Sequence, residues 1–342
     1  WNSPILLLSW KLAAALAAGN TAVIKPSEFA SASILELARL FEQAGFPEGV
    51  VNTVTGYGNE VGEPLVAHPL VRKVAFTGGE IGGRKVYETA AKHFKGVTLE
   101  LGGKSPNIVF ADANLDNAVK GAISGIFAAS GQTCIAGSRL LVQKSIEQEF
   151  TQRLVEFAAT AKMGDPKKLD TQVGPITTQP QYQRVLNYID IARQEGAKTL
   201  LGGGKPDDPA LKQGWFVQPT VFGNVRNSMR IAQEEVFGPV LSIIPFADDD
   251  EAIAIGNDIA YGLAAGVWTS SMARAFKMSD RLQAGTVWVN TYRAVSYMSP
   301  FGGYKASGLG RESGQDSIYE FLQTKSVWIS FAEKVANPFI LR

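Results

Sequence analysis

Short apolar stretches of strand character alternate with stretches of helical periodicity along the first third of the chain. The strand-like stretches are residues 21–26, 49–56, 71–79, 96–103 and 106–112. The helix-like stretches are residues 10–20, 33–45 and 81–94, and the first two end in or beside a glycine, which is typical of a helix terminus. Apolar strands separated by helices indicate an α/β fold with a parallel sheet covered by helices on both faces.

The alternation continues after residues 102–103, where we place a domain boundary. A helix is predicted near residues 115–129, followed by a loop that contains Cys134. Two polar helices are predicted near 146–162 and 179–195, and strands at 138–143, 240–247, 264–269 and 285–290. Residues 325–330 form an isolated apolar strand-like stretch, and we expect it to pair with a strand of another subunit.

Composition excludes several classes of protein. The chain has 342 residues, enough for two domains, and its net charge of +1 argues against a nucleic-acid partner. Lys11 interrupts the longest apolar stretch, residues 4–20, so we expect a buried helix there and no membrane partner. The single cysteine allows no internal disulfide, and a cytoplasmic location is the default expectation.

Cys134 and Glu100 are candidates for chemistry, although each has a purely structural alternative. Cys134 lies among small and polar residues, but a lone cysteine is more often a small core residue than a nucleophile. Neither histidine, His68 or His93, has the setting of a base that pairs with a cysteine or of a zinc ligand. Glu100 lies on an apolar strand before two glycines, where burial would raise its pKa and favour a general base; an edge-facing position is equally compatible.

Two glycine-rich segments resemble phosphate-binding loops. Gly56, Gly58 and Gly62 follow a strand, but their spacing is one residue longer than that of the dinucleotide fingerprint. Residues 76–79, "FTGG", end a strand and open a helix, so their backbone N–H groups could face a phosphate. A simple strand-to-helix turn would also require glycine there.

A series of motifs together resembles the aldehyde dehydrogenase superfamily. In chain order they are "WNSP", "IKPSE", "FTGG", "TLELGGKSPNIVF", "GQTCIAGSR", "EEVFGPV", "YGLAAGVWT", "GTVWVN" and "SPFGGYKASGLGRE". The resemblance covers residue 1 to about residue 330, and "ELGGKSP" with "GQTC" is its most specific part. It makes Cys134 the expected nucleophile.

The resemblance implies oxidation of an aldehyde to a carboxylic acid through a thiohemiacetal and a thioester. The Cys134 thiolate would attack the carbonyl, while the Asn2 amide and the Cys134 backbone N–H would stabilise the oxyanion. Glu100 would activate the water that hydrolyses the thioester. A dehydrogenase that passes the thioester to coenzyme A is disfavoured because Glu100 is present. A catalytically inactive member is disfavoured because all three residues are present.

The resemblance also implies NAD as cofactor, with NADP as an alternative, and no metal. Lys25 and Glu28 would hold the adenosine ribose, and Gly78 and Gly79 would lie near the pyrophosphate, with Gly79 at the place where relatives often have serine. The remaining implied cofactor contacts, around the nicotinamide and its ribose, are Leu101, Glu235 and Phe237.

The implied fold is a variant Rossmann cofactor domain plus an α/β catalytic domain. Residues 1–102 would be the C-terminal part of the NAD-binding domain, and the chain is expected to lack the N-terminal part of the family domain. Residues 103–306 would form the catalytic domain. Residues 307–342 would return to the cofactor domain and supply, at about 325–330, the oligomerisation strand of a homodimer or homotetramer.

The resemblance places the aldehyde pocket around Phe127, Thr133, Ile135 and Phe301, together with the loop 291–300. Ala128 and Ala129 are small, which is compatible with a bulky aldehyde. In that loop, Arg293 is expected either to meet a carboxylate or, as is commoner for a loop arginine, to be solvated.

Overall fold

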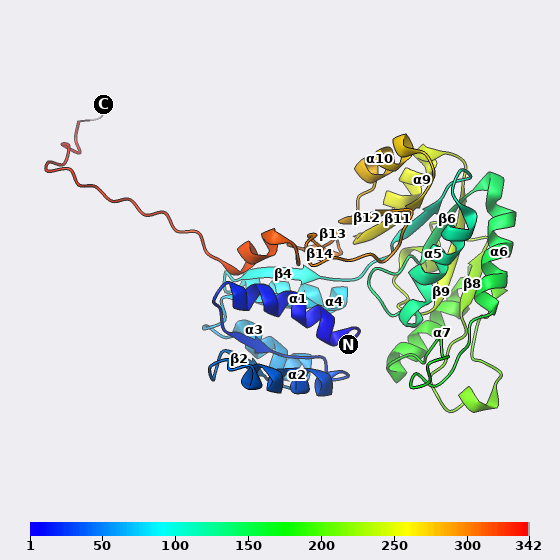
Figure 1. Cartoon of the computed structure of the whole chain (residues 1–342), viewed down its shortest axis with the longest axis horizontal. Helices are drawn as coiled ribbons and strands as arrows, with labels where there is room; N and C mark the ends of the chain where they lie inside the picture. The colour runs from blue at the N-terminus through cyan, green and yellow to red at the C-terminus, as the bar shows by residue number, and fades with distance from the viewer. Residues whose placement is uncertain (341–342) are drawn as a thin grey trace.

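The computed structural model describes residues 1–340, which form two lobes with the N-terminus between them (Figure 1). The first lobe begins with helix α1, strand β1, helix α2 and strand β2. Its remaining elements up to residue 100 follow in order, namely the π-helix η1, α3, β3, α4 and β4. The bounds in order are Pro4–Ala17, Ala22–Ile24, Ser31–Gln43, Val51–Thr53, Gly58–Gly62, Glu63–Ala67, Lys73–Thr77, Glu80–Ala91 and Gly96–Glu100.

The first lobe contains two small sheets. Strands β1 and β2 are parallel, and so are β3 and β4. The third strand of the second sheet, β14 (Gly308–Leu309), comes from near the chain's end and pairs antiparallel with β4, so that Gly308 lies opposite Glu100. The short strands β10 (Tyr261–Gly262) and β13 (Tyr304–Lys305) pair antiparallel with each other. The chain therefore returns to the first lobe after building the second.

The second lobe is built on one seven-stranded sheet in the order β12-β11-β5-β6-β9-β8-β7. All neighbours are parallel except the edge strand β7, which is antiparallel to β8. In sequence order the strands β5 to β9, β11 and β12 are Pro106–Val109, Arg139–Gln143, Lys198–Leu201, Thr220–Gly223, Val240–Phe246, Ala264–Trp268 and Thr286–Val289. The α-helices α5 to α10 are Leu115–Phe127, Glu147–Ala159, Gln179–Gln194, Arg230–Gln233, Asp249–Asn257 and Met272–Arg281. The 3-10 helices η2 to η5 are Ala128–Gly131, Lys144–Ile146, Pro209–Leu211 and Gln315–Phe321.

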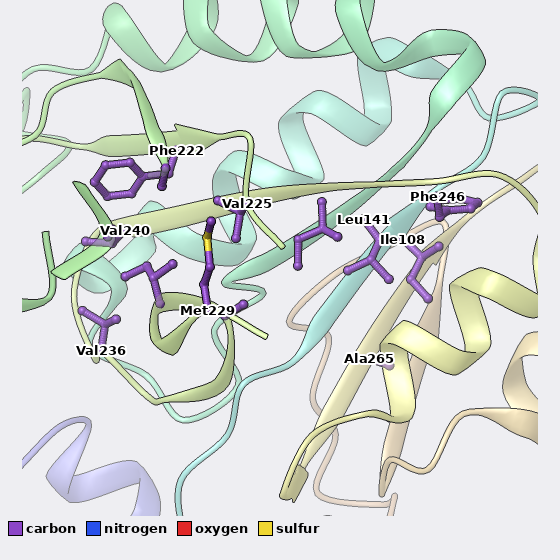
Figure 2. Close-up of a cluster of buried hydrophobic side chains, with 14 of the residues drawn as sticks. Ile108, Leu141, Phe222, Val225, Met229, Val236, Val240, Phe246 and Ala265 are labelled. Carbon is purple, nitrogen blue, oxygen red and sulfur yellow. The ribbon is translucent and has the colours of Figure 1, made fainter. Parts of the chain in front are cut away.

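Helices cover both faces of this sheet. Successive strand residues point to opposite faces, so the buried strands contribute apolar side chains to a helix-covered cluster on each side. On one face, side chains such as Ile108 and Leu141 pack against helices α7 to α10. Figure 2 shows these two side chains with Met229, which precedes α8. On the other face, Val109 and Leu140 pack against α5 and α6. The predicted α/β fold with a two-sided parallel sheet is therefore confirmed for this lobe.

Three segments differ from the expectations. Helix α1 is only partly buried, with Leu12 and Ala15 in the core and Ile5 about half exposed, because its packing partners α2, β1 and η5 cover one side. The glycines at 56–62, which resemble a phosphate-binding loop in sequence, introduce the π-helix η1 and α3. Residues 325–330 pair with no strand within residues 1–340 and lie in an extended arm (Figure 1), so their oligomerisation role stays a prediction.

No helix among residues 1–340 combines the length and the apolar character needed to cross a membrane.

Helix α5 carries a glycine that the packing requires. A Cβ at Gly121 would lie 1.9 Å from Cζ2 of Trp268, and the Trp268 indole is buried and donates a 2.8 Å hydrogen bond to Asn107. Gly121→Ala should therefore lower the free energy of unfolding by roughly 1–3 kcal/mol, although alanine favours a helix by about 1 kcal/mol. Urea unfolding measures this, with Ser124→Ala, an exposed position of the same helix, as the control. Equal stability of the two variants would contradict the packing argument.

Candidate active site

The loop that carries Cys134 lies between α5 and β6. Ala129, Ser130 and Gly131 have left-handed backbone conformations with φ of 51°, 53° and 69°. A Cβ at Gly131 would lie 2.0 Å from the carbonyl oxygen of Gly238, so glycine is required for this close approach. The tight turn leaves Cys134 half-buried before β6, which is an accessible position for a nucleophile.

The surroundings of Cys134 oppose its ionisation. Burial raises the pKa of the thiol to about 12, and the charges of Glu235 and Glu100 add to the increase. The backbone N–H groups of Cys134 and Ile135 act in the opposite direction. The free thiol is therefore protonated at neutral pH, and formation of the thiolate requires a base.

Glu100, the predicted base, lies in a buried environment at the end of the first lobe's sheet. It is the last residue of β4, its side chain is buried, and neither carboxylate oxygen has a hydrogen-bond partner within the described chain. Its backbone is fixed, because Gly78 N–H donates to the Glu100 carbonyl at 3.1 Å and Leu101 N–H donates to Ser307 at 2.9 Å. Burial, followed by the charge of Glu312, raises the pKa of Glu100 to about 9.

A lysine and a second buried carboxylate lie behind Glu100, and the sequence analysis assigned a role to neither. Lys11 of α1 donates to Glu312 and, at 2.6 Å, to the Thr77 hydroxyl. The Lys11 charge lowers the pKa of both carboxyls, although burial keeps each raised. Glu312 falls in the quoted motif "GLGRE", so the motif itself was the available signal. One ammonium facing two buried carboxylates favours retention of a proton by the pair.

Two glycines join the Glu100 strand to the Cys134 loop. A Cβ at Gly103 would lie 2.4 Å from the Cys134 carbonyl oxygen, and a Cβ at Gly102 would lie 2.6 Å from Oε2 of Glu235. The Gly103 N–H donates to Oε1 of Glu235 at 3.0 Å. The structure thus brings the predicted residues Glu100, Cys134 and Glu235 together. Burial raises the pKa of Glu235 to about 7, and the Gly103 N–H and Lys104 partly offset this.

Helix α7 holds the segment that contains Glu235 and Phe237. Gln181 donates to the carbonyls of Val236 and Phe237 at 2.8 and 3.0 Å, and Arg184 donates to the Glu235 carbonyl at 2.8 Å. Phe237 has a left-handed φ of 59°, and its ring meets Trp1 edge to face at 5.0 Å. The sequence analysis missed Gln181 and Arg184, because nothing in a polar helix marks which residues reach a distant loop.

Lys104 and Arg139 are buried cations that the sequence analysis also missed. The Arg139 guanidinium donates to the backbone carbonyls of Lys104, Ile255 and Gly256 and to the Asn227 side chain, at 2.8–3.0 Å. It therefore fixes the loop after Glu100 to the start of β6. Burial, and then the Arg139 charge, lowers the pKa of Lys104 to about 7.

A cleft of about 960 Å³ lies beside the Cys134 loop. Its walls include Trp1, Asn2, Ala129 and Gln132, with residues 174–177, 210–211 and 213–216. Asn2 therefore shares a cleft with the loop that carries Cys134.

The predicted aldehyde-pocket residues lie elsewhere around that loop. Thr133 and Ile135 flank Cys134 in the chain. Phe127 packs in the core under α5, and Phe301 contacts Trp10 with the rings 5.1 Å apart. The assignment of these four residues to a substrate pocket stays a prediction.

The predicted cofactor residues of the first lobe lie at strand ends and suit a dinucleotide. Lys25 and Glu28 follow β1, where Glu28 is exposed and Lys25 reaches Gly62 and donates to the Pro26 carbonyl. Gly79 is exposed before α4, and no atom lies within 4 Å of where its Cβ would be. An open helix N-terminus favours phosphate, and a carboxylate accepts from ribose hydroxyls, so the donor set fits NAD. Within residues 1–340, no group of three or more histidine, cysteine, aspartate or glutamate side chains is placed to hold a metal ion.

Comparisons with known proteins agree with this geometry. A family model described as "Aldehyde dehydrogenase family" matches residues 1–327. The chain is 48% identical to aldehyde dehydrogenase, cytosolic 1, of Rattus norvegicus, over 98% of this chain and 66% of the relative. It is 44% identical to betaine aldehyde dehydrogenase of Brucella anthropi, over 99% of this chain and 69% of the relative.

A solved structure of a similar protein covers the same region. A point mutant of betaine aldehyde dehydrogenase from Staphylococcus aureus, in complex with NAD+, matches with a TM-score of 0.97 at 41% identity, over 99% of this chain and 69% of that chain. The chain spans about two thirds of the length of the curated relatives it matches.

The charges around Cys134 predict how its reactivity responds to substitution. Glu235→Gln should speed alkylation of Cys134 by iodoacetamide about three- to tenfold at about pH 8.5, because loss of the Glu235 charge lowers the thiol pKa. Mass spectrometry of the Cys134 peptide gives the rate. Glu234→Gln is the control, since that neighbouring carboxylate pairs with Arg230 instead. An unchanged rate in Glu235→Gln would contradict the charge interaction.

Proposed function

The chain belongs to the aldehyde dehydrogenase family, and we propose that the protein oxidises an aldehyde to a carboxylic acid with NAD and water as co-reactants. The observation that carries the proposal is a half-buried thiol whose ionisation is opposed by the charge of Glu100, a buried carboxylate without hydrogen-bond partners among residues 1–340, while the Gly103 backbone packs against the Cys134 carbonyl. The fold agrees, because a solved family member matches with a TM-score of 0.97.

In the proposed first step, the Cys134 thiolate adds to the aldehyde carbonyl and forms a thiohemiacetal. The thiol proton must leave, and Glu100, when ionised, is the acceptor that its position supports. The Cys134 backbone N–H and the Asn2 side-chain amide would donate to the new oxyanion, and each such donor contributes roughly 3–4 kcal/mol. The presence of Asn2 in the cleft beside the cysteine loop is compatible with this role.

In the proposed second half, water hydrolyses the thioester that Cys134 carries after oxidation. Glu100 accepts a proton from the water, whose oxygen then attacks the thioester carbonyl, and the Cys134 sulfur leaves as the acid is released. The unpartnered Glu100 oxygens are available for this water. With its pKa near 9, Glu100 must pass its own proton onward, and Glu312 with Lys11 supplies polar neighbours for that transfer.

NAD, when bound, supplies a hydride acceptor. The proposed contacts are Lys25 and Glu28 at the adenosine ribose, Gly78 and Gly79 at the pyrophosphate, and Leu101, Glu235 and Phe237 around the nicotinamide end. The support in the first lobe is the open helix N-terminus and the exposed carboxylate at Glu28. The support in the second lobe is the fixed segment under α7, which carries Glu235 and Phe237. NADP is the alternative cofactor.

The proposed assembly is a homodimer or homotetramer in the cytoplasm. The arm that would supply the intersubunit strand exposes Val327, Trp328 and Ile329, which are 70%, 95% and 73% exposed. Water-exposed apolar side chains in an extended segment favour pairing with another sheet. The cytoplasmic location is supported by the name of the cytosolic rat relative.

The two proposed catalytic residues act at different steps, so their variants should differ. With an aldehyde and NAD, Cys134→Ala should form no NADH, because the covalent carrier is lost. Glu100→Gln should give a burst of NADH and then a steady rate reduced about 100-fold, because hydrolysis needs the base most. Rapid-mixing absorbance resolves both phases. Turnover of Cys134→Ala within tenfold of the parent would contradict the proposal, and loss of the burst in Glu100→Gln would move that residue's role to thiol activation.

Cofactor choice tests the role of Glu28. A carboxylate accepts from the 2′-hydroxyl of NAD but repels the 2′-phosphate of NADP, so the parent should favour NAD. Glu28→Ala should lower the NAD-to-NADP ratio of kcat/KM about tenfold. Glu36→Ala, which removes an exposed carboxylate on α2, is the control. A parent that favours NADP, or an unchanged ratio in Glu28→Ala, would show that the assignment is wrong.

A further inference from the structure

Arg293 is held against the nucleophile's loop rather than extended into solvent. Its side chain is half-buried, and Nη1 donates to the Thr133 hydroxyl at 3.4 Å. Thr133 directly precedes Cys134, so the guanidinium is anchored on the loop that carries the thiol. A cation therefore lies beside the position where the aldehyde carbonyl reacts.

The backbone around Arg293 is fixed on both sides. Tyr292 is buried, and its hydroxyl donates to the carbonyl of Ile135 at 3.0 Å, on the other side of Cys134. Trp288 donates to the Ala294 carbonyl at 2.7 Å, and its ring lies 4.7 Å from that of Tyr292. Arg293 itself has a φ of 65°, a left-handed conformation that is costly for a residue with a long side chain. Such strain persists where the surroundings impose it, and here they aim the side chain at Thr133.

The Arg293 charge has no counter-ion within residues 1–340. No carboxylate is placed to form an ion pair with it, and the groups that favour its charged form are Tyr292 and Cys134. Its only side-chain hydrogen bond in that part of the chain is the long one to Thr133, so most of its five donors are free. A half-buried guanidinium is expensive without an anion, and its planar fork matches a carboxylate.

We propose that Arg293 binds a carboxylate of the substrate, and that the substrate is an aldehyde with a carboxylate at its far end, a semialdehyde of a dicarboxylic acid. This inference rests on the proposed function, because the aldehyde carbon must be at Cys134 for the carboxylate to reach Arg293. The reaction is unchanged: the aldehyde carbon is oxidised, and the distant carboxylate takes no part in bond making. Arg293 determines specificity and is not a catalytic residue.

The first test compares substrates of matched length in the full-length protein with NAD. The parent should have a kcat/KM for succinic semialdehyde about 10- to 100-fold above that for butanal, as expected for a charge-assisted contact. Arg293→Gln should remove most of that ratio, mainly through KM, and Arg293→Lys should keep part of it. Lys198→Gln, an equal charge change on the opposite edge strand β7, should leave the ratio unaltered.

The outcomes separate this inference from the proposed function. NADH formation from butanal without preference for succinic semialdehyde would overturn the role of Arg293 and leave the proposed function intact. Absence of NADH from every aldehyde would overturn the proposed function, and the substrate class with it. A stronger preference for a phosphorylated aldehyde would overturn the carboxylate assignment.

A second test needs no turnover. Iodoacetate and iodoacetamide alkylate Cys134 with the same geometry, but only iodoacetate carries a carboxylate. A cation beside the thiol should favour iodoacetate, so Arg293→Gln should lower the iodoacetate-to-iodoacetamide rate ratio at least threefold. Mass spectrometry of the Cys134 peptide gives both rates. An unchanged ratio would show that the Arg293 charge does not act at the nucleophile.

Discussion

The site depends on the contact of one glycine backbone with another loop. Gly103 lies so close to the Cys134 carbonyl that any side chain at this position would collide with it. A side chain at the neighbouring Gly102 would likewise collide with the Glu235 carboxylate. This contact joins the last strand of the first lobe to the nucleophile's loop and to the segment under α7. Glu100 belongs to the first lobe and Cys134 to the second, and this contact ties the segments that carry them.

Burial without full pairing gives the site its electrostatic character. Glu100, Glu312 and Cys134 all have raised pKa values because the protein excludes water around them, while Lys11 neutralises only one charge. Such an arrangement costs stability, since an ionised carboxylate loses its hydration. The proposed chemistry explains why it is kept, because a base with a high pKa and free oxygens can take a proton from water.

The same logic applies to cations on the other side of the cysteine. Arg139 donates to backbone carbonyls and holds two loops together, so its role is structural. Arg293 lacks such partners among residues 1–340 and lies on a fixed backbone at the loop that carries Cys134. Two buried or half-buried arginines therefore have different roles, and what distinguishes them is whether the chain supplies their acceptors.

Local periodicity in the sequence predicted most helices and strands, because burial on a sheet or helix face imposes its own spacing on apolar residues. The motifs identified the family and drew attention to Cys134, Glu100 and Glu235. The π-helix at 58–62 escaped prediction, because glycines spaced along a segment signal backbone freedom without specifying which hydrogen bonds form. The roles of Lys11, Gln181 and Arg184 escaped it as well, since long polar side chains look alike in sequence.

What the sequence by itself determined was thus the fold class, the family and the residue types available for chemistry. Folding alone places Glu312, 212 residues after Glu100 in the chain, behind it, and sets Arg293 against Thr133 with no carboxylate partner among residues 1–340. The physical reason is that charge interactions depend on distance and burial in space. Those quantities are set when β14 returns to pair with β4 and the loop after β12 packs on the cysteine, and neither contact is local in sequence.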